Sequence, residues 1–213
     1  MSEHPTSNRR DQAVPPSIAG DDRRSRLLAA GLDLFTERGF HGTTVADLCA
    51  RADVSPRDFE QEFGSRESLV VALHDDVNNR ALAAVIFALD GVDPNDVPKR
   101  ISRATHAYLG VMTTDRRWAQ IAILESVGIS PAAEEHRRIA IDRFAALMEA
   151  EAQRLAADGV IPQRDFHLTA VAMTGAVYGL INTWTADVDW DVEVDKIVAE
   201  VTRLIVLALG YEG

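Results

Sequence analysis

The chain has 213 residues, enough for one domain or two unequal ones with a real hydrophobic core. Hydrophobic residues make up 46% and charged residues 26%, so the composition excludes a globally disordered chain and a low-complexity filament. The net charge of −11 argues against a protein that coats nucleic acid through bulk positive charge.

The single cysteine, Cys49, excludes an internal disulfide and a cysteine-cluster metal site, as fits a reducing compartment. The N-terminal twenty residues contain no apolar signal segment. The most apolar stretch, 168–181, is shorter than the ~20 residues that a membrane span needs. We therefore expect a cytoplasmic protein without a membrane partner.

Helical spacing dominates the chain after its first residues. Residues 1–21 are rich in Pro and polar residues and contain no aromatic residue, which predicts a flexible N-terminal arm. Beyond them apolar residues recur every three or four positions, which indicates an all-α fold. We expect longer helices at 22–38, 65–89, 97–113, 115–127, 131–157, 165–186 and 191–209.

Two short helices are predicted between the first two long ones. Thr44-x-x-Asp47 has the spacing of a capping box and starts a helix that ends near Ala52. Ser55-Pro56-Arg57-Asp58 combines an N-cap serine, a proline at the first helical position and an acid at the third, and this helix runs to Phe63. A short helix, a three-residue turn and a second capped helix form a helix-turn-helix, whose second helix suits the major groove of DNA.

The sequence here resembles the N-terminal domain of the TetR family of transcriptional regulators over residues 22–82. The resemblance rests on the positions Leu27, Leu28, Ala29, Ala30, Leu34, Phe35, Gly39, Phe40, Gly42, Thr43, Thr44, Val45, Asp47, Leu48, Ala52, Asp53, Val54, Ser55, Phe59, Phe63, Ser65, Arg66, Glu67 and Leu69. So many spaced matches are more specific than a helix-turn-helix pattern alone.

The resemblance implies a DNA-binding surface formed by Thr44, Ser55, Pro56, Arg57, Asp58, Gln61 and Arg66. Thr44 and Arg66 stand where the family contacts phosphates. Arg57 has the donors to pair with guanine, and Gln61 with adenine, although either side chain can equally contact phosphate.

The chain departs from the family pattern on the second helix of this motif. Glu60 stands where the family usually has a phosphate-binding tyrosine, and Glu62 where a histidine follows. Asp53 stands where glycine is frequent, and Asp tolerates the left-handed conformation that a turn requires. Because carboxylates repel phosphates, we expect weak background binding and a strict operator.

The last two predicted helices suggest an interface between two copies of the chain. Gly175 and Gly179 lie on one helical face, where each costs ~1 kcal/mol relative to alanine, so another element is expected to approach closely. Packing within the chain and packing in a dimer remain open. The predicted dimer residues are Ala172, Gly175, Gly179, Ile197, Val201, Leu204 and Ile205. A twofold dimer implies a palindromic operator with half-sites ~34 Å apart or a multiple of that.

Aromatic, Met and polar residues of the central helices are candidates for an effector cavity or for ordinary core. The predicted effector residues are His106, Met112, Trp118, Phe144, Met148, Tyr178 and Asn182. The histidines lack metal-binding spacing, and no nucleophile or phosphate-loop motif is present, so we expect no metal, cofactor or enzymatic activity.

The sequence thus predicts an N-terminal three-helix helix-turn-helix domain (22–82) and a larger C-terminal helical ligand-binding and dimerisation domain (83–213). The expected function is a homodimeric, ligand-responsive repressor whose effector is small and apolar or amphipathic. In the expected mechanism, ligand binding favours a state in which the helix at 65–89 has moved. The two DNA-binding motifs of the dimer then no longer match the two half-sites of the operator. The alternative is a dimeric helical ligand-binding or protein-interaction module that has lost DNA binding.

Overall fold

A computed structural model describes residues 23–123, 129–186 and 193–212, and within these ranges the chain forms nine α-helices and no strand. The helices are α1 (Arg23–Arg38), α2 (Val45–Ala52), α3 (Pro56–Glu62), α4 (Arg66–Leu89), α5 (Val97–Thr114), α6 (Arg116–Ile123), α7 (Pro131–Ala157), α8 (His167–Ala186) and α9 (Val194–Leu209). The all-α prediction is confirmed. The predicted arm, 1–21, lies outside the described residues, as do parts of the segments predicted at 115–127 and 191–209.

Local hydrogen bonds set the boundaries of the short helices. The Thr44 hydroxyl accepts a hydrogen bond from the Asp47 amide at 3.2 Å, and the Asp47 carboxylate accepts one from the Thr44 amide at 3.0 Å. This reciprocal pair satisfies two amides that the first turn of α2 leaves without helical partners. Asp53 ends α2 with φ of 53°, the left-handed conformation that the sequence anticipated.

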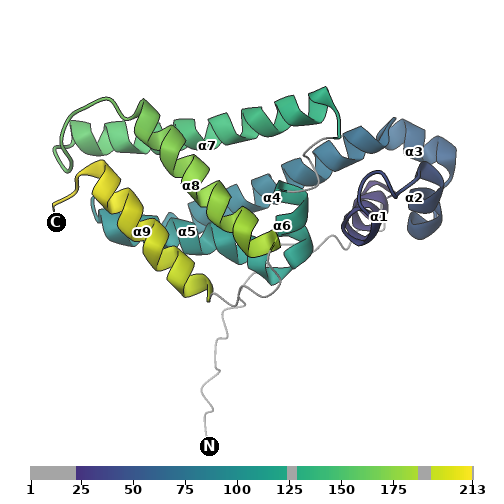
Figure 1. Cartoon of the computed structure of the whole chain (residues 1–213), viewed down its shortest axis with the longest axis horizontal. Helices are drawn as coiled ribbons and strands as arrows, with labels where there is room; N and C mark the ends of the chain where they lie inside the picture. Colours follow the sequence, from purple (N-terminus) through teal and green to yellow (C-terminus); the bar gives the residue numbers. More distant parts are fainter. Residues whose placement is uncertain (1–22, 124–128, 187–192, 213) are drawn as a thin grey trace, which may run out of the picture.

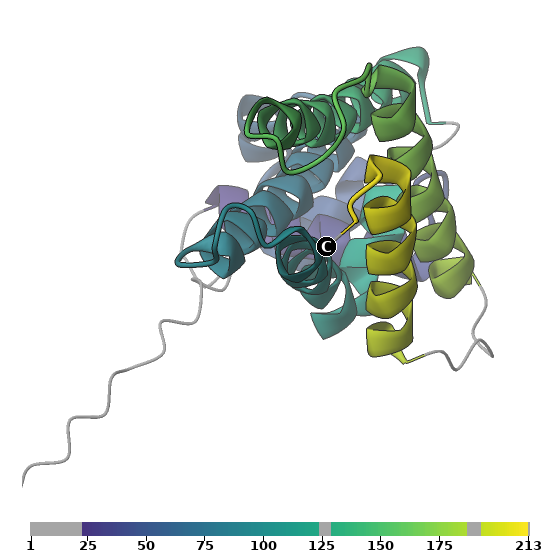
Figure 2. The same cartoon turned by 90° about the vertical axis from the view of Figure 1, so that its left-hand side faces the viewer.

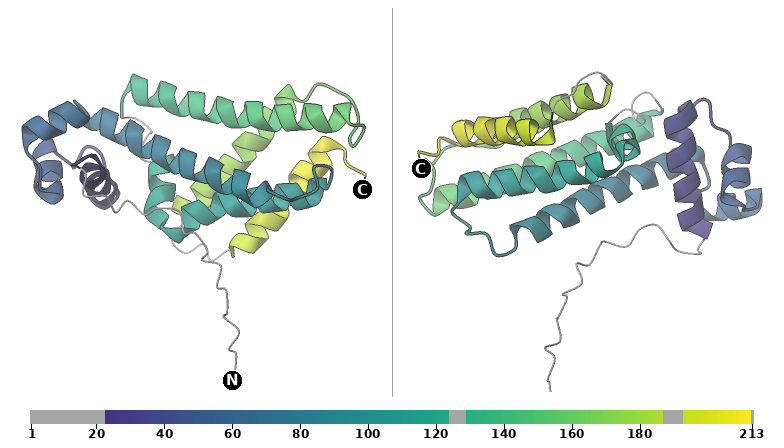
Figure 3. Two further views of the ribbon diagram at one scale, coloured as in Figure 1. Left: turned by 180° about the vertical axis from the view of Figure 1, so that it is seen from behind. Right: turned by 90° about the horizontal axis from the view of Figure 1, so that it is seen from below.

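The three N-terminal helices form one end of the molecule, and α4 runs from them along the remaining helices (Figure 1). α1 stands across this end, with α2 and α3 outside it (right panel of Figure 3). At the other end α8 and α9 lie side by side on one flank (Figure 2). The predicted domain boundary at residue 82 falls inside α4, and the division into two domains stays a prediction.

Buried side chains connect the N-terminal helices to the rest of the chain. One cluster includes Phe35, Leu48 and Phe59 together with residues of α4, α5, α6, α8 and α9. A smaller cluster, around Phe166 and Leu209, lies at the opposite end. Among the described residues, no helix combines the length and the apolar character that crossing a bilayer requires. The continuous core mechanically joins α1–α3 to the helices that surround the cavity described below.

Candidate functional site

The two short helices are held at their angle by a small apolar core. Leu48, Cys49 and Ala52 of α2 pack with Phe59 and Phe63, and all five side chains are buried. Burial raises the pKa of the Cys49 thiol, which keeps this cysteine neutral and structural. These five side chains form the interior of the helix-turn-helix.

One side of α3 is directed to solvent. Pro56, Arg57, Glu60 and Gln61 are exposed, because the apolar Phe59 turns the opposite side of the helix toward α1 and α2. An arginine and a glutamine on a protruding short helix supply the donors that recognise guanine and adenine edges. α3 therefore has the shape and the chemistry of a groove-reading element, with Glu60 as an added negative charge.

Asp58 has a structural partner on each side, which changes the role predicted for it. Its carboxylate accepts a hydrogen bond from the Ser55 hydroxyl at 2.7 Å and forms an ion pair with Arg23 of α1. The hydrogen bond from Ser55, reinforced by the charge of Arg23, holds the pKa of Asp58 below its usual value. Asp58 thus caps α3 and ties it to α1, and its charge is compensated within the protein.

Arg66 also differs from its predicted role as a phosphate contact. Its guanidinium donates to the carbonyls of Phe40 and Thr43 and stacks over the Phe40 ring at 4.6 Å. The side chain therefore holds the turn before α2 in place. Thr44 is exposed, and its hydroxyl donates to Asp47 at 2.6 Å. Three of the seven predicted DNA-binding residues, Pro56, Arg57 and Gln61, have exposed side chains. Among the described residues, no hydrogen bond or ion pair holds these three side chains against the protein.

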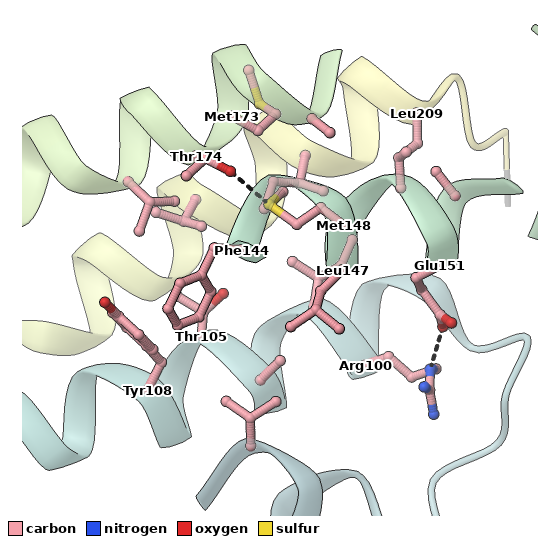
Figure 4. A pocket seen from close by; sticks show the side chains of 18 of the residues that line it. Arg100, Thr105, Tyr108, Phe144, Leu147, Met148, Glu151, Met173, Thr174 and Leu209 are labelled. Atoms are coloured by element: carbon pink, nitrogen blue, oxygen red, sulfur yellow. Dashed lines mark hydrogen bonds and ion pairs between the residues drawn. The ribbon is translucent and has the colours of Figure 1, made fainter. Parts of the chain in front are cut away.

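A cavity of about 390 Å³ lies among α4, α5, α7, α8 and α9 (Figure 4). This volume falls in the range of small-molecule sites, which are mostly apolar with a few polar groups. Tyr108 and Phe144 meet edge-on in its wall, with ring centroids 5.3 Å apart. Two lining residues, Ile86 of α4 and Leu147 of α7, are 64% and 53% exposed, so the cavity opens to solvent between these helices.

The predicted effector residues divide into two groups. Phe144, Met148 and Tyr178 line the cavity as expected. Met112 and Trp118 do not, because both are buried in the main core, where Arg80 stacks over the Trp118 ring. His106 and Asn182 were also assigned wrongly, since both side chains are exposed on the outer surface.

The sequence analysis did not predict several of the residues that line the cavity. The wall also contains Leu82, Ile86, Arg100, Thr105, Leu147, Glu151 and Thr174. A signal for part of this set exists in the sequence, because the stretch 81–89 is apolar around most of the helix, more than one buried face requires. No comparable signal marks Arg100 or Glu151, which look like ordinary surface charges.

The predicted dimer residues also divide. Ala172, Gly175 and Gly179 are exposed on the outer side of α8, and a Cβ atom at either glycine meets nothing within 4 Å. Packing within the described chain therefore does not explain these glycines. Ile197 and Val201 were assigned wrongly, because both are buried in the core of the chain itself. Ile205 lines the cavity, and Leu204 is half-buried.

The comparisons with known proteins agree with this geometry. Residues 27–73 match the model of the bacterial regulatory proteins of the tetR family. The chain is 26% identical over 121 residues to the HTH-type transcriptional regulator YdgC of Bacillus subtilis, which covers 56% of this chain and 60% of that protein. It is 27% identical over 190 residues to the HTH-type transcriptional regulator EthR of Mycolicibacterium smegmatis, covering 87% of this chain and 85% of EthR. These matches support a transcriptional regulator of the TetR type.

The TetR-type fold extends beyond the matched segment. The structure resembles that of the regulator FadR from Bacillus subtilis in complex with stearoyl-CoA, with a TM-score of 0.73 over 86% of this chain and 97% of that one. At 12% identity, this likeness concerns the fold alone. The helix-turn-helix in the matched segment is α2–α3, and the cavity is lined by residues outside that segment.

Proposed function

We propose that the protein is a ligand-responsive transcriptional repressor that binds a palindromic DNA operator as a homodimer. The observation that carries the DNA-binding part is the outward side of α3, which offers Arg57 and Gln61 while Asp58 is neutralised by Arg23. The protein would act in the cytoplasm, where chromosomal DNA is accessible. Ligand binding would favour the conformation in which the two copies of α3 no longer match the half-sites.

The ligand-responsive part is supported by the cavity and by one relative of similar fold. FadR from Bacillus subtilis has been crystallised with stearoyl-CoA, an amphipathic molecule with a long apolar chain. The cavity of the present chain has an apolar wall and an apolar mouth, which suit a ligand of similar character. The outer side of α8, with its small residues, is the surface that we propose for the dimer.

Selection of genomic fragments from the source organism by the purified full chain, at two salt concentrations, tests the DNA-binding function. We expect enrichment of one palindromic site, loss of that enrichment in Arg57→Ala, and retention in the control Arg103→Ala. The control removes the same charge from an exposed position on α5, far along the chain from α3. The absence of any enriched site at low salt would contradict the proposal.

A second candidate function is a dimeric ligand-binding or protein-interaction module with degenerate DNA binding. It is favoured by the exposed carboxylate of Glu60, which faces the same side of α3 as Arg57 and Gln61. The double substitution Glu60→Tyr and Glu62→Lys separates the two functions. A large gain in DNA affinity from a level near zero supports the degenerate module, whereas measurable specific binding by the unmodified chain supports the regulator.

A further inference from the structure

We propose that the effector is an aliphatic carboxylate, whose chain occupies the cavity and whose carboxylate group binds the guanidinium of Arg100. The inference rests on the proposed function, in which this cavity is the effector site. It adds the chemical class of the ligand and the residue that recognises its charged end.

The wall of the cavity selects an apolar chain. Its described lining consists of aliphatic, aromatic and methionine side chains, a few hydroxyl groups and two charged residues, Arg100 and Glu151. Burying a polar or charged group against such a wall without partners is unfavourable, whereas burying methylene groups is favourable. The exposed Ile86 and Leu147 extend this apolar surface to the mouth.

The charged pair lies at one side of the cavity, across the view from Tyr108 (Figure 4). Arg100 Nε donates to Glu151 Oε1 at 3.1 Å, and the Arg100 side chain is only 19% exposed. A guanidinium has five N–H donors in a planar fork, and this hydrogen bond uses one of them. A guanidinium can donate two parallel N–H···O hydrogen bonds to one carboxylate. Arg100 is therefore a complementary partner for the acid group of a ligand.

Glu151 can release Arg100 without becoming an unpaired charge. Its carboxylate also accepts hydrogen bonds from Nε and Nη2 of Arg154, each at 3.0 Å. Arg154 in turn pairs with Asp158 at 2.7 Å. Burial raises the pKa of Glu151, but the hydrogen bonds from Arg154 and the charge of Arg100 outweigh burial and leave this pKa below its usual value. When Arg100 turns to a ligand, Glu151 keeps Arg154 as its partner.

A neutral hydroxyl group could accept a hydrogen bond from Arg100 but would bring no opposite charge to it. A half-buried arginine in an apolar wall is costly unless it is paired, and it is the cationic member of the pair that has a donor fork to offer. An acid is therefore favoured over an alcohol of the same chain length by the strength of a charge-assisted hydrogen bond.

The test is isothermal titration calorimetry of the full-length protein with decanoate and with 1-decanol as probes. We expect decanoate to bind more tightly than 1-decanol by about tenfold or more, the range of a charge-assisted hydrogen bond. In Arg100→Met this preference disappears while the affinity for 1-decanol is retained, which also shows that the variant is folded. Arg103→Met, three residues along the same helix and exposed, keeps the preference.

Glu151→Gln gives a change in the opposite direction. It removes the internal competitor for Arg100, while Asp158 still compensates Arg154, so decanoate should bind more tightly than to the unmodified protein. Equal affinity for the two probes, binding of neither, or a preference that survives Arg100→Met overturns the proposal. Tight binding of stearoyl-CoA that is indifferent to Arg100→Met and exceeds that of decanoate also overturns it.

The effect of the ligand on DNA binding is measured separately from ligand binding itself. If decanoate binds through Arg100 but does not change the affinity for the selected operator fragment, the assigned ligand chemistry stands and the ligand-responsive part of the proposed function fails. If operator fragments are bound but neither probe enters the cavity, the regulator stands and the carboxylate assignment fails.

Discussion

Arg117 of α6 contacts Asp33 of α1, with 2.5 Å between Nη1 and Oδ1. Asp33 also accepts a hydrogen bond from Arg51 of α2 at 3.0 Å. On its other side α6 receives a hydrogen bond from the cavity residue Tyr178, whose hydroxyl donates to the Ala122 carbonyl at 3.1 Å. A contiguous set of polar contacts therefore joins the cavity wall to the helix-turn-helix through α6, in addition to the direct connection through α4.

Arg117→Gln should lower the free energy of unfolding by about 1 kcal/mol or less, because the ion pair with Asp33 is partly exposed. The loss should shrink at high salt, which screens exposed charges. Urea unfolding at two ionic strengths measures both effects. Arg138→Gln is the control, since Arg138 pairs only with Glu135 and Asp142 of its own helix among the ion pairs described. A loss that is unchanged at high salt contradicts the prediction.

Gly31→Leu should destabilise the protein by about 1–3 kcal/mol, the usual cost of overpacking a core. A Cβ atom at Gly31 would lie 3.0 Å from Cδ2 of Leu69 and 3.2 Å from Cδ1 of Leu73, where α1 crosses α4. Gly110→Ala is the matched control, because a Cβ atom there meets nothing within 4 Å and alanine favours the helix by up to about 1 kcal/mol. Thermal unfolding of both variants distinguishes close packing from a general intolerance of glycine replacement.

His74 should make the protein less stable as the pH falls from about 6.5 to about 4. Burial lowers the pKa of His74 to about 4, and the adjacent His136 ring, 5.4 Å away, acts in the same direction. The unfolded chain binds a proton at this residue near its ordinary pKa of 6.5, so it holds more protons than the folded chain across this window. The contribution lost is about 3 kcal/mol.

The measurement is urea unfolding at pH 7, 5.5 and 4.5 for the unmodified chain and for His74→Leu. Leucine fills the buried position with an apolar side chain that does not titrate. The variant should lose less stability over this range, and the difference reports His74 because the neighbouring Asp75, His136 and Arg137 are present in both proteins. His41→Gln, at an exposed position, should follow the unmodified chain. Parallel pH profiles of the unmodified chain and His74→Leu would be inconsistent with this role.

Val171→Glu should convert the proposed dimer to monomers. Val171 is 48% exposed on the outer side of α8, beside Ala172 and one turn from Gly175, and a carboxylate there would be buried without a partner in the interface. Sedimentation velocity at micromolar concentration measures the change in mass. Ala146→Glu introduces the same charge on the exposed side of α7 and should leave the dimer intact. A dimer that tolerates Val171→Glu, or a monomeric unmodified chain, argues against this interface.

Local sequence signals predicted the helices and the reading motif well. Thr44 with Asp47 and Ser55 with Asp58 form capping boxes, and Asp53 adopts a left-handed conformation that this residue type tolerates, because these features depend on residues only a few positions apart. The buried residues of the motif, such as Leu48 and Phe59, are spaced at the helical period that the sequence shows. The sequence also indicated the family, through the spacing of these same residues.

The roles of side chains depended on contacts between distant segments. Asp58 forms an ion pair with Arg23, and Arg66 donates hydrogen bonds to the carbonyls of Phe40 and Thr43. These partners lie 23 or more positions away along the chain. Met112 and Phe144 have similar hydrophobic character, but one lies in the core and the other in the cavity wall. Period and composition determine which side of a helix is apolar, whereas the packing of that side against another helix or around empty space is decided only when all the helices assemble.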